Sequence, residues 1–119
     1  MEPCVFCKIV QKEEPAKVVF ENDEFLAFSP LKEVSRGHTI LIPKKHSQDI
    51  FDIEKELLGR LMGVAQKLAA DLILKNSAMG INILHASGHS AQQSIFHFHF
   101  HIVPRYENDG LEIWFKNNL

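Results

Sequence analysis

The 119-residue sequence contains few of the features that mark secreted or membrane-bound chains. It has only two cysteines, too few for the disulfide framework on which small secreted domains depend. Its apolar runs are far shorter than the roughly 20 residues that a membrane-spanning helix needs. The start, Met1-Glu2-Pro3-Cys4, lacks the basic and apolar regions of a signal peptide, so we expect a cytoplasmic protein. The formal net charge of -2 argues against nucleic acid or a membrane as partner.

Tyrosine and tryptophan are also scarce, with one of each, whereas phenylalanine occurs nine times and histidine seven times. Phenylalanine fills a core without requiring a hydrogen-bond partner. Histidine needs more explanation, because its imidazole can act as a metal ligand, a base or a nucleophile. The length and the 45% apolar content predict a single domain over residues 1–119.

Alternating and apolar segments predict a sheet of five strands, at residues 16–21, 24–29, 38–43, 80–85 and 95–103. Asn22-Asp23 is a candidate hairpin turn between the first two strands. The strand at 38–43 is apolar throughout, which predicts a central position in the sheet. Short connections favour a mostly antiparallel sheet with a helix on one face, an α+β fold.

Apolar residues at three- and four-residue steps predict a long helix from about Glu54 to Asn76. Asp52 is the candidate N-cap of this helix. Gly59 and Gly63 weaken a helix, so we expect another element to pack closely against them.

The last predicted strand alternates phenylalanine and histidine from Phe96 to His101. Because strand side chains point alternately to opposite faces, the three phenylalanines should face the core, and His97, His99 and His101 should share the other face. An exposed edge strand that happens to carry histidines would be an alternative explanation. Three imidazoles in strict alternation instead favour a shared ligand, and one metal ion could reach two neighbouring rings.

The segment Gln93-Ser94-Ile-Phe-His97-Phe-His99-Phe-His101-Ile-Val-Pro104 resembles the signature of the histidine-triad (HIT) family. The upstream segments Cys4-Val-Phe-Cys7-Lys-Ile, Leu26-Ala-Phe and Gly37-His38-Thr-Ile-Leu-Ile-Pro-Lys-Lys45-His46 also stand in the family's order and spacing. The resemblance covers nearly the whole chain and is closest to the Hint-like branch with an N-terminal zinc site. It implies the HIT fold, with a five-stranded antiparallel sheet, a long central helix and a short N-terminal helix.

The resemblance also implies a reaction in which His99 attacks the α-phosphorus of a purine nucleoside phosphoramidate or related nucleotide. The nucleotidyl-histidine intermediate is then hydrolysed. A neutral imidazole suits this role, and its second ring nitrogen should donate to an acceptor such as a backbone carbonyl.

Further roles follow from the same resemblance. His101 would donate to phosphate oxygens, Gln93 would orient the leaving group and Ser94 would supply donors to the phosphate. Family members are homodimers, and Trp114 is a candidate either for closing the pocket or for a dimer interface. The full set of expected nucleotide contacts is His38, Gln93, Ser94, His99 and His101, with Ile9, Phe28 and Leu31 around the base.

Cys4-x-x-Cys7 alone could be two buried thiols, a redox pair or half of a metal site. A structural zinc site needs four ligands. The resemblance implies that His46 and His97 complete this site with Cys4 and Cys7.

The sequence departs from the family at Pro30, where an Asp commonly contacts the ribose, at Ala86, where an Asn is common, and at Gln92, where Gly is usual. His85 and His89 have no role that the sequence predicts. Three other functions stay open: a dinucleoside polyphosphate hydrolase, a catalytic zinc hydrolase, and a nucleotide-binding module without activity.

Overall fold

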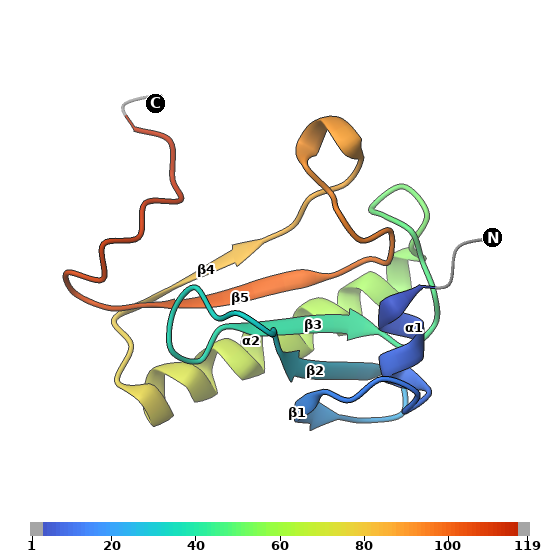
Figure 1. Cartoon of the computed structure of the whole chain (residues 1–119), viewed down its shortest axis with the longest axis horizontal. Helices are drawn as coiled ribbons and strands as arrows, with labels where there is room; N and C mark the ends of the chain where they lie inside the picture. The colour runs from blue at the N-terminus through green and yellow to red at the C-terminus, as the bar shows by residue number, and fades with distance from the viewer. Residues whose placement is uncertain (1–3, 117–119) are drawn as a thin grey trace.

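The protein is described by a computed structural model that covers residues 4–116. Its five strands form one antiparallel sheet in the order β1-β2-β3-β5-β4 (Figure 1). The strands are β1 (Lys17–Glu21), β2 (Phe25–Ser29), β3 (Thr39–Pro43), β4 (Gly80–Leu84) and β5 (Phe100–Arg105). The helices are α1 (Val5–Val10), α2 (Lys55–Asn76) and the short 3-10 helix η1 (His89–Ala91). The predicted α+β fold is confirmed.

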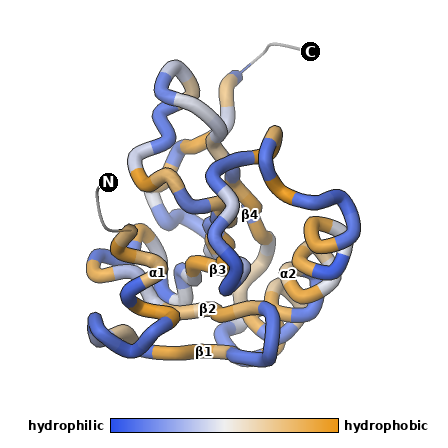
Figure 2. Tube along the Cα trace, turned by 90° about the vertical axis from the view of Figure 1, so that its right-hand side faces the viewer, coloured by the Kyte–Doolittle hydropathy of each residue, from blue (hydrophilic) through white to orange (hydrophobic). Residues whose placement is uncertain are grey.

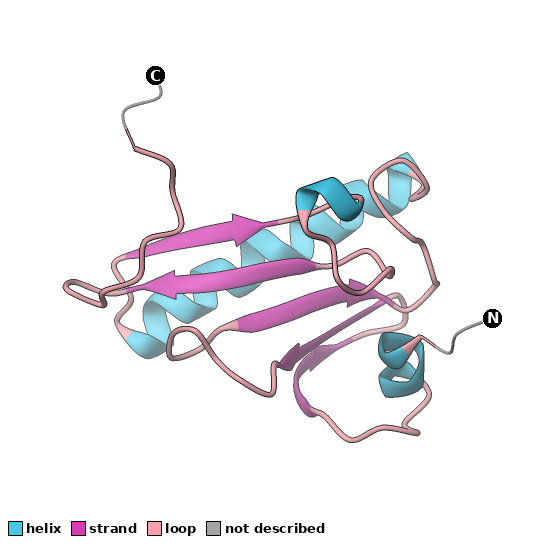
Figure 3. Cartoon of the chain, turned by 45° about the horizontal axis from the view of Figure 1, so that its top comes forward, coloured by secondary structure: helices cyan, strands magenta, loops and turns pink. Residues whose placement is uncertain are grey.

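The long helix α2 covers one face of the sheet (Figure 3). Its buried side is the apolar stripe expected from the sequence, formed by Leu57, Leu61, Ala65 and Leu68. This stripe packs in one cluster with Phe98, Phe100 and Ile102, with two alternate residues of β2 and with Leu41 of β3. Figure 2 shows that apolar residues follow the strands and part of α2, while the connecting loops are largely hydrophilic.

The opposite face of the sheet is only partly covered, by α1 at the end of β3 (Figure 1). Phe6 and Ile9 of this helix form a second apolar cluster with Leu26, Phe28, Ile40 and Ile42. Alternation along β5 places Phe100 and Ile102 toward α2, so His101 between them faces the α1 side. The uncovered part of the α1 face is therefore the place where the histidines can meet a ligand.

The predicted hairpin and central strand are confirmed. Asn22 closes the β1–β2 turn, where its side-chain oxygen accepts hydrogen bonds from the backbone N–H groups of Glu24 and Phe25. β3 is buried along its whole length and lies third in the order of five strands. Within residues 4–116, no helix combines the length and the apolarity needed to cross a membrane.

The prediction of a continuous strand over residues 95–103 is wrong at its start, because β5 begins at Phe100. Residues 95–97 form a bend, and the N–H of Phe98 bonds to the carbonyl oxygen of Ser47 rather than to a neighbouring strand. Phe98 and Phe100 still reach the core, but Phe96 is only half-buried beside His89. His97 and His99 therefore precede the strand.

Two details of the long helix also differ from expectation. Glu54, not Asp52, occupies the N-cap position, because the Asp52 carboxylate accepts the N–H of Gln48 and is used in the preceding turn. Gly59 and Gly63 face open space, with no atom within 4 Å of an added Cβ, so the close packing predicted there is absent within the described chain.

Candidate active site and metal centre

An open cavity of about 840 Å³ lies on the α1 face of the sheet. One part of its wall is polar and includes Ser94, His99 and His101, whereas α1 and β2 supply apolar side chains. The expected base-pocket residues Ile9, Phe28 and Leu31 all line this cavity. Its size and mixed lining suit a small organic ligand with a polar group.

His99 is 8% exposed, and its ring packs edge-on against Phe6 with the centroids 5.2 Å apart. Its Nδ1–H donates to the backbone carbonyl oxygen of His97 over 2.7 Å. This bond leaves Nε2 with its lone pair, and no described residue forms a hydrogen bond with that atom. Burial lowers the pKa of His99, although the hydrogen bond to the His97 carbonyl opposes the shift. The site therefore holds a neutral imidazole with an uncommitted nitrogen.

His101 has the opposite tautomer, because a chain of hydrogen bonds fixes it from behind. The backbone N–H of Val34 donates to Nδ1 of His38 over 3.2 Å, so this atom is unprotonated. The Nε2–H of His38 then donates to Nδ1 of His101 over 2.8 Å. A neutral His101 must carry its proton on Nε2 as a donor. Burial lowers its pKa to about 4 and also lowers the pKa of His38.

His38 and Gln93, which were expected to contact the nucleotide, do not line the cavity. His38 instead contacts His101, which lines the cavity, through the hydrogen bond between their rings. Gln93 is buried, and its side-chain amide is occupied by the backbone. Its Oε1 accepts from the N–H of Gly88, and its Nε2 donates to the carbonyls of Gln48 and Ile95. Gln93 therefore holds the loop before the histidines, rather than presenting a free amide to a ligand.

The four residues of the implied metal site lie together, beside the cavity. The ligand atoms of Cys4, Cys7, His46 and His97 are all within 4.8 Å of one another. Nδ1 of His97 is 3.3 Å from Sγ of Cys4 and 3.6 Å from Sγ of Cys7, and Nδ1 of His46 is 3.3 Å from Sγ of Cys7. These sulfur–nitrogen contacts connect the start of α1 with the segment that carries His99.

The arrangement of His97 fits a metal ligand. Its Nε2–H donates to the carbonyl oxygen of Pro43 over 2.8 Å, which directs the lone pair of Nδ1 toward the two sulfur atoms. Burial lowers the pKa of His97 to about 4, so the ring is neutral. Burial and the neighbouring Cys4 raise the pKa of the Cys7 thiol to about 11, because they disfavour the charged thiolate. A bound cation would stabilise the thiolate. Two sulfur and two imidazole ligands suit zinc.

The sequence profile of the HIT domain matches residues 11–108 of this chain. The chain belongs to the HIT family. An uncharacterised HIT-like protein of Borreliella burgdorferi is 42% identical over 121 aligned positions, which cover 100% of this chain and 87% of the relative.

Solved HIT structures share this fold. A HIT family protein of Bacillus anthracis superposes with a TM-score of 0.90 at 38% identity, covering 98% of this chain and 84% of the other. A zinc-bound histidine triad family protein of Mycobacterium smegmatis gives a TM-score of 0.88 at 35% identity, over 97% of this chain and 84% of its own. HIT proteins form a superfamily of nucleotide hydrolases and transferases.

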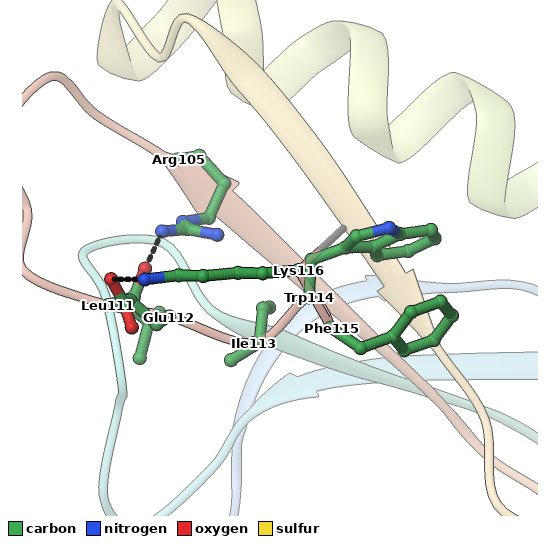
Figure 4. A pocket seen from close by; sticks show the side chains of 7 residues that line it. All are labelled: Arg105, Leu111, Glu112, Ile113, Trp114, Phe115 and Lys116. Atoms are coloured by element: carbon green, nitrogen blue, oxygen red, sulfur yellow. Dashed lines mark hydrogen bonds and ion pairs between the residues drawn. The ribbon is translucent and has the colours of Figure 1, made fainter. Parts of the chain in front are cut away.

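A second hollow of this HIT chain, about 420 Å³, lies under the C-terminal segment (Figure 4). Its lining contains Arg105, Glu112, Lys116 and the stacked pair Trp114 and Phe115, but no histidine or cysteine. It thus lacks the groups that the chemistry of the histidine cavity uses. Trp114 is 65% exposed and does not line the histidine cavity of its own chain, so it does not close that cavity here.

Sequence reasoning assigned no role to His85, which the structure places directly against His99. Its Nδ1 lies 3.0 Å from the backbone carbonyl oxygen of His99, and its ring stacks on Phe98 with the centroids 4.3 Å apart. The sequence places His85 only at the end of a strand, and this position does not predict the contact with the His99 carbonyl. His89, by contrast, is exposed and contacts Phe96 away from the cavity.

Proposed function

We propose that this HIT protein hydrolyses a purine nucleoside phosphoramidate, or a related nucleotide, at its α-phosphorus through a covalent intermediate on His99. The observation that supports this most directly is the tautomer of His99. With Nδ1–H committed to the His97 carbonyl, Nε2 keeps its lone pair beside a cavity large enough for a nucleotide. An uncharged ring nitrogen is the form of histidine that can attack phosphorus.

In the first step, Nε2 of His99 forms a bond to phosphorus while the bond from phosphorus to the leaving nitrogen breaks. The leaving amine takes the bonding electron pair and a proton from water. In the second step, the remaining hydroxyl of that water attacks phosphorus, and the electron pair of the P–Nε2 bond returns to His99. One water molecule is consumed, and the products are an amine and a nucleoside monophosphate. The Nδ1–H of His99 stays on the His97 carbonyl throughout, which stabilises the positively charged ring.

The Nε2–H of His101 is the proposed donor to a phosphate oxygen, with Ser94 as a second donor at the cavity wall. Donors that face the developing negative charge are commonly the largest contribution to such catalysis. His38 would act by holding His101 in its tautomer, and Gln93 by fixing the loop that ends at Ser94. Both are therefore proposed as positioning residues.

The apolar wall with Ile9, Phe28 and Leu31 is the proposed base subsite. Pro30, which also lines the cavity, has no side-chain acceptor for a ribose hydroxyl. We therefore expect a weak preference for ribose, since one hydrogen bond contributes about 0.5–1.5 kcal/mol.

Cys4, Cys7, His46 and His97 would hold a structural zinc ion, which supplies a cross-link between α1 and the segment before β5. The proposed reaction uses none of these ligands. The homodimer, the cytoplasmic location, the absence of nucleic-acid and membrane partners, and the single-domain organisation over 1–119 stay predictions.

Steady-state hydrolysis of an adenosine phosphoramidate tests the proposal with His99→Asn and the matched control His89→Asn. The new amide can still donate to the His97 carbonyl but has no nucleophilic ring nitrogen. We expect His99→Asn to lose activity by a factor of about 10⁴ or more, the scale for removing a covalent nucleophile. Zinc content and the control should stay as in the wild type. Wild-type turnover by His99→Asn would refute the proposal.

The same assay separates the other candidate functions. Activity that a chelator removes, and that metal restores without refolding, would indicate a catalytic metal. Faster turnover of dinucleoside polyphosphates would indicate that substrate class. Nucleotide binding without turnover of either class would indicate a binding module.

A further inference from the structure

The backbone that carries His99 lies just past the end of the sheet. β4 pairs with β5 as far as Leu84 with His101, and β3 pairs with β5 as far as Leu41 with Phe100. His99 lies beyond the last pair of both ladders, in a segment without strand geometry. The position of its ring therefore depends on contacts other than the hydrogen bonds of the ladders.

His85, the first residue after β4, supplies such a contact with its side chain. Its Nδ1–H donates to the backbone carbonyl oxygen of His99 over 3.0 Å. Its ring stacks on Phe98 at 4.3 Å and an interplanar angle of 25°, and meets Phe100 edge-on at 5.9 Å. Phe98 and Phe100, the two chain neighbours of His99, thus both contact the His85 ring, which donates to the His99 carbonyl.

A second hydrogen bond fixes the orientation of the His85 ring. The hydroxyl of Ser87 donates to Nε2 of His85, and its oxygen accepts the backbone N–H of Ile50 over 2.9 Å. With Nε2 as acceptor, the proton of the neutral ring must lie on Nδ1, where it faces the carbonyl of His99. A continuous chain of donors and acceptors therefore runs from the loop at Ile50 through Ser87 and His85 to His99.

We propose that His85, oriented by Ser87, is a positioning residue that holds the His99 backbone so that Nε2 of His99 points into the cavity. This inference rests on the proposed function of His99. His85 does not line the cavity, so it has no direct contact with the ligand. Its effect should fall on kcat rather than on KM, because a displaced nucleophile slows the chemical step while the binding surface is retained.

Three variants separate positioning from mere packing. His85→Phe keeps an aromatic ring for Phe98 but removes the donor to the carbonyl of His99. His85→Asn places an amide N–H where Nδ1 stands, so it restores the donor without the ring. His89→Phe makes the same change at a neighbouring exposed histidine that contacts only Phe96 among the aromatic rings.

With the adenosine phosphoramidate as substrate, we expect His85→Phe to lower kcat about tenfold or more, since small displacements of reacting groups cost up to about 100-fold. KM should change little, His85→Asn should recover most of the loss, and His89→Phe should match the wild type. Unchanged kcat in His85→Phe, or no recovery in His85→Asn, would overturn the proposal. If His85→Phe does not fold, Ser87→Ala takes its place, and unchanged kcat in that variant would contradict the proposal equally.

Long-range ¹H–¹⁵N spectra of the imidazole nitrogens test the same proposal without turnover. In the wild type, His99 should show a protonated Nδ1 and an unprotonated Nε2. In His85→Phe these signals should move toward a mixture of tautomers, and in His85→Asn they should return. Unchanged His99 signals in His85→Phe would overturn the positioning role. Failure of the proposed function appears differently, as a wild-type protein without turnover.

Discussion

The imidazoles of His38 and His101 share one hydrogen bond, 2.8 Å from Nε2 of His38 to Nδ1 of His101. Because Val34 donates to the other nitrogen of His38, the direction of this bond is determined. His101 therefore presents a donor to the cavity, while His99 beside it presents a lone pair. The two adjacent histidines have complementary roles because two different backbone groups fix their tautomers.

His38→Leu should lower kcat about tenfold or more, because His101 loses the partner that keeps its proton on Nε2, and misdirected groups are costly in an active site. His38→Asn, in contrast, leaves a polar side chain at the position and should be less impaired. Steady-state kinetics with the adenosine phosphoramidate measures both. Equal kcat for the wild type and His38→Leu would show that His101 does not need this partner.

Cys4→Ala should abolish stoichiometric zinc binding and lower the thermal stability, because it removes one of four ligands that connect α1 to residue 97. Each 1 kcal/mol lost corresponds to a decrease in Tm of about 4 °C in a domain of this length. Metal analysis and thermal unfolding measure the two effects. His89→Ala is the control and should keep both zinc and Tm. A full complement of zinc in Cys4→Ala would contradict the four-residue site.

Acid should destabilise the fold between pH 6.5 and about 4, because burial lowers the pKa of His101 from its ordinary 6.5 to about 4. In this window the unfolded chain binds the proton more readily than the folded chain. The stability is therefore complete above pH 6.5 and is lost as the pH falls toward 4. Tm measured against pH should fall less steeply in His101→Asn than in the wild type or in His89→Asn. Identical slopes would exclude this contribution.

Gln92→Gly should stabilise the protein by about 1 kcal/mol, because an L-residue in the left-handed region costs roughly 1–2 kcal/mol. Gln92 has φ 71° at the end of η1, directly before the buried Gln93. Gly88→Ala is the matched opposite change, since Gly88 has φ 93° and no atom within 4 Å of an added Cβ. Chemical denaturation should show higher stability for the first variant and lower stability for the second. A destabilised Gln92→Gly would refute the argument.

Much of the fold could be predicted because its signals are local. The apolar stripe of α2, the wholly apolar β3 and the turn at Asn22 each follow from neighbouring residues. The four residues of the metal site were predictable for a different reason. They are far apart in the sequence, and only the resemblance to the HIT family brought them together.

The remaining features depend on contacts between distant segments. Alternation predicts a strand through His97 and His99. In the structure, the N–H of Phe98 donates to the Ser47 carbonyl, and the strand begins only at Phe100. Asp52 resembles an N-cap, yet its carboxylate bonds to Gln48. The partner of His85 is a backbone carbonyl 14 residues away, a group that every residue possesses and that no sequence pattern marks.

Mass spectrometry of the intact protein, quenched during turnover of the adenosine phosphoramidate, shows whether His99 is the nucleophile. We expect an added mass equal to one adenylyl group, which peptide mapping should place on His99. The adduct should be absent in His99→Asn and present in His89→Asn. An active wild-type enzyme that never carries the adduct, or an adduct on any other residue, would rule out a covalent intermediate on His99.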